Sequence, residues 1–234
     1  MRPRFKISCM LEAKKSRWFE EIFAVYNRNL FKRRFRSLSV SGLDFLKNRN
    51  PDTPFLIYAN HSSWWDGLVA FQISRAARLD SFIMMEEMQL KKLFLFRRLG
   101  AFSVVRENPR RAARSLNYAA ALLKENSNRT LWIFPQGEIL PNDGRPLNFY
   151  RGAARVVEKA ARVSAVPLAI RYEFLGDFKP EIFVKIGAPQ LVSVDKNFSA
   201  ESLTRQFERR LTETLDALKS DVLTKTFDEH EKIV

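Results

Sequence analysis

The chain has 234 residues, a hydrophobic fraction of 46% and a formal net charge of +14. This length is enough for one sizeable core, and no linker-like segment divides it. The excess of basic residues favours an anionic partner, which leaves nucleic acid, a membrane surface and an acidic substrate open. A single cysteine, Cys9, excludes an internal disulfide framework and fits a reducing compartment.

The sequence shows no targeting or membrane-spanning segment. Its start lacks the apolar core of a signal peptide, and no apolar run approaches the roughly 20 residues that cross a bilayer. We therefore expect a protein that is soluble or peripheral to a membrane.

Residues 11–36 are predicted to form one long helix or two short ones. Aromatic and aliphatic residues recur there at three- and four-residue spacing, and basic residues flank them. This combination is typical of an interfacial helix in an anionic membrane surface. The alternative is an ordinary amphipathic helix packed on the core with a solvated basic face. The apolar set is Trp18, Phe19, Ile22, Phe23, Tyr26, Leu30 and Phe31, and the basic set is Lys14, Lys15, Arg17, Arg28, Lys32, Arg33, Arg34 and Arg36.

Apolar runs and helix-period segments alternate through the rest of the chain, which predicts an α/β fold. We expect a mostly parallel or mixed sheet with helices on both faces. The expected strands are 37–40, 55–59, 81–85, 101–105, 129–134, 165–171 and 181–186, the last clear one. The expected helices are a turn at 43–47, a helix containing residues 68–73 and capped by Ser62 or Ser63, and helices at 86–98, 109–124, 153–162 and 200–220.

Three segments follow from this pattern: a membrane-associating segment at 1–36, the main domain at 37–220 and a C-terminal tail at 221–234. The sequence Asn142-Asp143-Gly144 predicts a turn inside the main domain. The tail is expected to fray, with His230 incidental.

Residues 60–67, Asn-His-Ser-Ser-Trp-Trp-Asp-Gly, form the corner between the strand at 55–59 and the next helix. A spacing of five residues is out of register for a shared helix face, so His61 and Asp66 meet only if His61 lies in the turn. The carboxylate can then fold back onto the imidazole, fix its tautomer and leave the other ring nitrogen free to take a proton. The alternative is a buried histidine satisfied by a capping aspartate, because this spacing alone is a weak signal.

Several segments, in order along the chain, together resemble the glycerolipid acyltransferase family that includes lysophosphatidic acid acyltransferases. The resemblance covers about 37–186. Its segments are Asn60-His61 with Asp66, Gly100 to Arg106, Phe134-Pro135-Gln136-Gly137, Phe149 with Arg151-Gly152, and Val166-Pro167-Leu168.

This resemblance implies acyl transfer from a thioester of coenzyme A or acyl carrier protein to a hydroxyl of a lysophospholipid such as 1-acylglycerol-3-phosphate. His61 would be the general base and Asp66 its orienting partner, with no acyl-enzyme, no cofactor and no metal. The acceptor phosphate would be bound by Arg106 and the amides around Gly137. The implied substrate-binding residues are Arg106, Phe134, Pro135, Gln136, Gly137, Glu138 and Arg151.

The implied localisation is the cytoplasmic face of the cell membrane, with the protein peripheral or monotopic. Its partners would be a membrane lipid acceptor, an anionic membrane surface and, for one of the two donors, acyl carrier protein.

The third segment departs from the family pattern Phe-Pro-Glu-Gly-Thr-Arg. The Glu, Thr and Arg are replaced by Gln136, Glu138 and Ile139. A carboxylate near a phosphate is repulsive by about 1 kcal/mol in water and about 4 kcal/mol at an intermediate dielectric, and the lost arginine removes a bidentate ligand. Either Arg106 and Arg151 compensate, or the acceptor presents a neutral polyol, glycolipid or other lipid alcohol.

Two other classes compete with this interpretation. A nucleic-acid binder would explain the charge, but the chain has no recognisable aromatic-basic module, so we expect no nucleic-acid partner. A non-catalytic membrane-associated protein on the same fold is the second alternative, and intact His61 and Asp66 argue against it.

Overall fold

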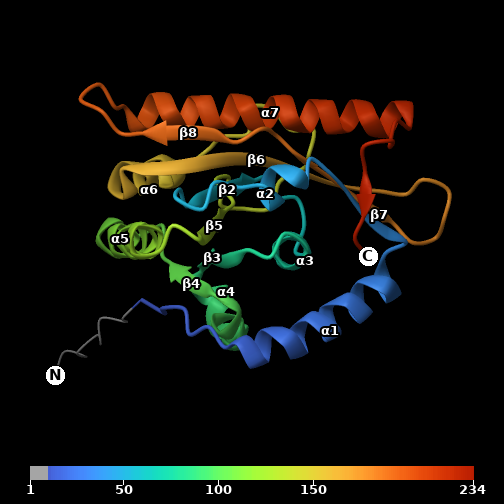
Figure 1. The fold of residues 1–234 in the computed structure, drawn as a ribbon, viewed down its shortest axis with the longest axis horizontal. Helices are drawn as coiled ribbons and strands as arrows, with labels where there is room; N and C mark the ends of the chain where they lie inside the picture. The colour runs from blue at the N-terminus through green and yellow to red at the C-terminus, as the bar shows by residue number, and fades with distance from the viewer. Residues whose placement is uncertain (1–9) are drawn as a thin grey trace.

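The computed structural model describes residues 10–234, as one layered α/β unit (Figure 1). Cys9 and the start of the chain, on which the signal-peptide expectation rests, lie outside these residues. The helices are α1 (Arg17–Arg34), α2 (Asp44–Lys47), α3 (Asp66–Ala76), α4 (Glu87–Lys92), the 3-10 helix η1 (Phe94–Leu99), α5 (Pro109–Glu125), α6 (Gly152–Ala160) and α7 (Ala200–Thr224). The strands are β1 (Ser37–Ser41), β2 (Phe55–Ala59), β3 (Asp80–Glu86), β4 (Ala101–Val104), β5 (Arg129–Ile133), β6 (Arg162–Glu173), β7 (Glu181–Ile186), β8 (Gln190–Ser193) and β9 (Glu231–Lys232).

The strands form one nine-stranded sheet in the order β4-β3-β5-β2-β6-β7-β1-β9, with β8 added to β6. Pairings from β4 across to β6 are parallel, as is that of β1 with β7. Strands β7 and β8 pair antiparallel with β6, and β9 pairs antiparallel with β1. The predicted fold class, a mostly parallel or mixed sheet, is confirmed.

Side chains of β2 alternate between two hydrophobic clusters, one on each face of the sheet. Leu56 and Tyr58 pack with α5, α6 and α7, whereas Phe55, Ile57 and Ala59 pack with α1, α2 and α3. This two-residue period is the geometry of a strand buried on both faces. In Figure 1, α7 runs along one side of the sheet and α1 along the other.

Parallel pairing brings the carboxyl ends of β2, β4 and β5 to the same edge of the sheet. His61 follows β2, Arg106 follows β4 and Phe134 follows β5. Side chains from separate sequence segments therefore meet at the edge where open α/β sheets place their ligand sites.

Helix α1 begins later than predicted, because residues before Arg17 hydrogen-bond to the rest of the domain. Leu11 N donates to Ser103 Oγ at 2.8 Å, and Ser103 N donates to the carbonyl of Leu11 at 2.8 Å. Lys14 N donates to the carbonyl of Arg97 at 2.8 Å. Ser16 caps the helix by accepting from Phe19 N at 3.4 Å. The prediction of a helix from residue 11 is wrong.

Two other helix predictions are corrected. The segment 86–98 is interrupted at Leu93, so that α4 is followed by η1 instead of one continuous helix. The N-cap of α3 is Trp65 and has no side-chain cap, so neither Ser62 nor Ser63 fills that role. Between residues 10 and 234, no helix combines the length and apolar character needed to cross a membrane.

The C-terminal segment is ordered, which corrects the expectation of a frayed tail. Helix α7 continues to Thr224. Strands β8 and β9 follow β7, which was expected to be the last clear strand. Ile233 N donates to the carbonyl of Leu38 at 3.0 Å. His230 lies edge-on against Phe183 and Phe227, with ring centroids 6.2 and 5.5 Å away. His230 is therefore part of the packing that holds the tail on the sheet.

Candidate active site

Asp66 is the first residue of α3 and is fully buried. One carboxylate oxygen, Oδ2, lies 2.8 Å from His61 Nδ1 and accepts from the main-chain amides of Ser62 at 2.7 Å and Ser63 at 2.9 Å. The other, Oδ1, accepts from the hydroxyl of Tyr172 at 2.6 Å. The carboxylate folds back onto the imidazole as the sequence predicted.

These contacts favour one tautomer of the His61 imidazole. Both Asp66 oxygens accept hydrogen bonds, and the helix N-terminus further stabilises an anion there. The carboxylate favours a proton on Nδ1 of His61, which leaves Nε2 with a free lone pair. Among residues 10–234, Nε2 has no hydrogen-bond partner, and the side chain is 24% exposed. This geometry favours one tautomer and leaves Nε2 able to accept a proton.

Tyr172 is a site residue that the sequence did not reveal. Burial raises the pKa of its hydroxyl well above the ordinary value, and the charge of Asp66 raises it further. The tyrosine therefore stays protonated and donates to Asp66 at neutral pH. The strand was expected to end at Arg171, but β6 continues to Glu173. Continuing its alternation past Ile170 would have placed Tyr172 on the α3 side of the sheet.

The main chain at His61 is held by the segment after β5. Gln136 is buried, and its Oε1 accepts from His61 N at 2.8 Å. Leu140 N donates to the carbonyl of His61 at 2.8 Å. The ring of Phe134 stacks on the imidazole with centroids 4.7 Å apart. These contacts position the base from three directions.

A cavity of about 770 Å³ opens beside His61. Most of its wall is apolar and comes from α1, α3, β3 and η1, which suits a hydrocarbon chain. Of the residues expected to bind substrate, all but Gln136 line it: Arg106, Phe134, Pro135, Gly137, Glu138 and Arg151. Gln136 instead contacts the main chain of His61.

Arg106 and Gly137 are in direct contact at this cavity. Gly137 has a φ of +71°, which strains any residue with a side chain, and a Cβ atom there would also displace the guanidinium of Arg106. The Arg106 guanidinium lies 5.5 Å from the centre of the Tyr150 ring, and its Nε is 3.7 Å from Oε2 of Glu86. One weakly paired cation therefore faces the cavity beside the glycine.

Arg151 and Glu138 are less constrained. Arg151 Nη2 lies 3.1 Å from Oε2 of Glu201 on α7, and both side chains are largely exposed. Glu138 is also exposed. The structure thus joins Arg106 with Gly137, whereas the guanidinium of Arg151 is paired with a carboxylate of α7.

Comparison with known proteins identifies the family of the chain. Residues 37–171, more than half of the chain, match the family model described as Acyltransferase. A protein of Streptococcus pneumoniae named 1-acyl-sn-glycerol-3-phosphate acyltransferase is 33% identical over 124 residues, covering 51% of this chain and 42% of the relative. The chain thus spans less than half the length of that relative. The family model covers more than half of the chain, and the chain therefore belongs to the acyltransferase family.

Proposed function

We propose that this chain transfers a fatty acyl group from an acyl thioester, of coenzyme A or acyl carrier protein, to a hydroxyl of a lysophospholipid such as 1-acylglycerol-3-phosphate. The observation that carries the proposal is the His61–Asp66–Tyr172 arrangement beside a large apolar cavity that also exposes Arg106. The name of the Streptococcus pneumoniae relative supports the phosphorylated acceptor.

The chemistry is a direct displacement. Nε2 of His61 removes the proton from the acceptor hydroxyl as its oxygen attacks the thioester carbonyl. The tetrahedral intermediate then collapses, the carbon–sulfur bond breaks, and the thiolate takes the proton from the imidazolium. Asp66 stabilises that imidazolium without taking its proton, because its carboxylate is held by two amides and Tyr172. No side-chain nucleophile is required.

Arg106 is the residue proposed to bind the acceptor phosphate. A guanidinium forms charge-assisted hydrogen bonds to phosphate oxygens, and Arg106 lines the cavity with a 3.7 Å ion-pair contact to Glu86. Gly137 lets the main chain approach this guanidinium closely. Arg151 would join only after leaving Glu201, which is an exposed and therefore weak pair.

A neutral acceptor is the second candidate, and Glu138 favours it. This carboxylate lines the same cavity as Arg106, where it would repel a phosphate but accept hydrogen bonds from a sugar or polyol. A glycolipid or other lipid alcohol would be acylated by the same chemistry.

The activity is tested by thiol release from palmitoyl-coenzyme A and palmitoyl-acyl carrier protein. The acceptors are lysophosphatidic acid, a glycolipid with one free hydroxyl and buffer alone. Acceptor-dependent release with lysophosphatidic acid supports the first candidate, and release with the glycolipid alone supports the second. The absence of acceptor-dependent release with either donor would contradict acyl transfer to both.

The same proposal places α1 against an anionic membrane surface, on the cytoplasmic face. Its inner residues Phe23 and Phe31 pack with the core, whereas Trp18 is 70% exposed and Tyr26 is 58% exposed. The last turn carries Lys32, Arg33 and Arg34. An outward apolar surface next to cations is the composition of an interfacial helix.

Vesicle binding tests this placement. Replacing Trp18 and Tyr26 together with serine should weaken binding to anionic vesicles about 10-fold, since both rings lose apolar contact. Leu223→Ser, an equally exposed change on α7 across the sheet, is the matched control. Binding should also weaken as salt rises. Equal binding by the double variant and wild type would exclude α1 as the contact surface.

A further inference from the structure

The loop formed by residues 140–148, between the segment after β5 and α6, contacts the His61 main chain, and its residues do not line the cavity. Leu140 N donates to the carbonyl of His61 at 2.8 Å, and Asn142 Oδ1 accepts from Asn60 Nδ2 at 2.8 Å. The Asn60 amide also donates to the carbonyl of Ile170 at 2.9 Å and accepts from its amide at 2.8 Å. Both protons of the Asn60 amide are used, so this side chain has one fixed orientation.

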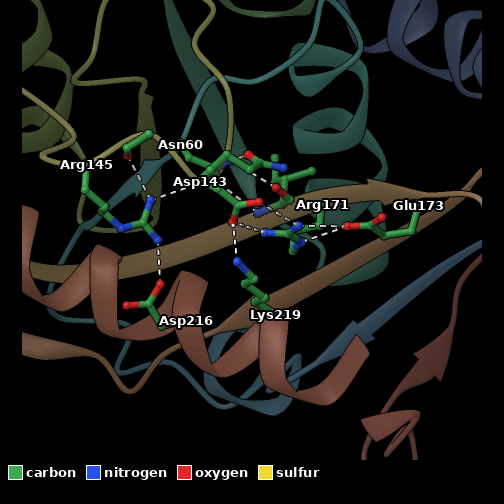
Figure 2. Close-up of polar contacts among 10 residues, drawn as sticks. Asn60, Asp143, Arg145, Arg171, Glu173, Asp216 and Lys219 are labelled. Carbon is green, nitrogen blue, oxygen red and sulfur yellow. Dashed lines mark hydrogen bonds and ion pairs between the residues drawn. The ribbon is translucent and has the colours of Figure 1, made fainter. Parts of the chain in front are cut away.

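Two cations hold the middle of this loop (Figure 2). Asp143 accepts from Arg171 Nη1 at 3.0 Å and lies 3.2 Å from Lys219 Nζ. Arg171 is buried and also bonds Glu173 at 2.9 Å. The hydrogen bond from Arg171 lowers the pKa of Asp143, as does the contact with Lys219, so the carboxylate is ionised at neutral pH.

Helix α7 holds the rest of the loop. Arg145 Nη2 bonds Asp216 Oδ1 at 2.5 Å, and Nη1 donates to two carbonyls of its own loop at 2.7 and 2.9 Å (Figure 2). Glu208 accepts from Asn148 N at 2.9 Å. Glu208, Asp216 and Lys219 fall on one face of α7, so a single helix contacts the middle of the loop and its C-terminal end.

Three consecutive residues of β6 tie this loop to the catalytic corner. Ile170 bonds Asn60, Arg171 bonds Asp143, and Tyr172 bonds Asp66. A shift of the loop would therefore act on the His61 main chain through Leu140 and Asn60, whereas Asp66 is bonded to Tyr172 on β6 as well as to the amides of Ser62 and Ser63. The distance between His61 and Asp66 depends on both.

We propose that Asp143, together with Asn142, is a positioning residue for His61, and that α7 controls the placement of the base through them. Neither residue contacts the cavity, so their effect is on the turnover step and not on substrate affinity. The kinetic part of this inference rests on the proposed acyl transfer. The positional part does not.

The kinetic test replaces Asp143 with asparagine, which keeps the shape and removes the charge between Arg171 and Lys219. We expect kcat to fall by about 10-fold, because sub-ångström displacement of a reacting group is costly, with each KM within about 2-fold of wild type. Asp143→Glu, which keeps the charge, should retain most of the activity. Unchanged kcat, or a raised KM with unchanged kcat, would overturn the proposal.

The positional test needs no activity. The His61 ring stacks on Phe134 at 4.7 Å, so its proton chemical shifts respond to small displacements. The chain has two histidines, and His61→Ala assigns their signals. Asp143→Asn should move the His61 signals and leave those of His230 in place. If wild type shows no acyl transfer, the proposed function fails, and this measurement alone decides the role of Asp143.

The control is Glu213→Gln, which removes a surface pair with Arg209 at 3.8 Å on the same helix. It should leave kcat and the His61 signals unchanged, and an equal loss in this variant would overturn the proposal. Should Asp143→Asn not fold, Lys219→Met removes one cation while the Arg171 contact remains. For Lys219→Met we expect a smaller loss of kcat together with shifted His61 signals. Wild-type kcat and wild-type His61 signals in this variant would contradict the positioning role of the loop.

Discussion

The polar wall of the cavity has two parts, the His61 corner and the proposed acceptor end formed by Arg106 and Glu138. They differ in how firmly their charged side chains are held. At the His61 corner, the buried Asp66 carboxylate has a partner for each oxygen, and the His61 main chain is bonded at both its amide and its carbonyl. At the proposed acceptor end, Arg106 has one ion-pair contact within residues 10–234, at 3.7 Å, and Glu138 is exposed. The His61 corner is therefore held in one geometry, whereas the side chains of Arg106 and Glu138 are less constrained.

The largest expected effect comes from removing the base. His61→Ala should lower kcat by roughly 10²–10⁴-fold and affect the unfolding temperature less, because Oδ2 of Asp66 keeps two amide donors. Thiol release and thermal unfolding measure the two quantities. The matched control is His230→Ala, a buried packing change far from the cavity that should lower stability and spare kcat. A His61→Ala variant with near wild-type turnover would refute the base assignment.

Tyr172→Phe tests whether turnover depends on the hydrogen bond that Tyr172 donates to Asp66. The change leaves Asp66 Oδ1 buried without its donor, which costs about 1–3 kcal/mol for a neutral acceptor and more for a charged one. We expect kcat to fall about 10-fold and the unfolding temperature to fall as well.

Because burial and Asp66 raise the tyrosine pKa, this loss should be constant around neutral pH. Tyr118→Phe removes a hydroxyl that only accepts from Ala13 N at 3.2 Å, and it serves as the control. If Tyr172→Phe and Tyr118→Phe both kept wild-type kcat, the hydrogen bond from Tyr172 to Asp66 would not contribute to turnover.

The sequence predicted the elements that local patterns define. Strands β2 and β7 have the predicted bounds, because continuous apolar runs end at breakers or at polar residues. The contact of His61 with Asp66 was also within reach, since the two residues are five apart in sequence. Local spacing and the strand-to-helix corner were sufficient for both.

What the sequence missed depends on contacts between distant segments. Tyr172 meets Asp66 across 106 residues, and Leu11 meets Ser103 across 92. Helix and strand periodicities do not predict contacts between residues so far apart in the sequence. The ordered tail is a similar case, because β9 is only two residues long and exists through its pairing with β1. Tertiary hydrogen bonds, and not local propensity, decided these elements.

Arg106→Met probes the acceptor end with a smaller expected effect. Removing the guanidinium should raise KM for lysophosphatidic acid several-fold and change kcat little, because the base and its partners are untouched. The KM for the acyl donor provides the internal control and should stay within about 2-fold. A fall in kcat at unchanged KM would show that Arg106 acts on the reaction step, which would remove the contrast between the two ends.

Glu138→Thr is expected to have the smallest effect, and its sign identifies the acceptor. If Arg106 binds a phosphate nearby, removing the carboxylate relieves a repulsion of about 1–4 kcal/mol, depending on the local dielectric. Exposure of Glu138 places the gain near the lower limit, so KM for lysophosphatidic acid should fall about 3-fold. If Glu138 instead accepts hydrogen bonds from a polyol, the same change should raise KM for a glycolipid.

Glu229→Thr, an exposed change in the C-terminal segment, should alter neither constant. Wild-type enzyme that acylates the glycolipid and ignores lysophosphatidic acid would exclude the phosphate. The acyltransferase chemistry at His61 would stand in that case, because its partners lie on β6 and α3 and not at the acceptor end. A loosely held Glu138 would then be the residue that sets the choice of acceptor.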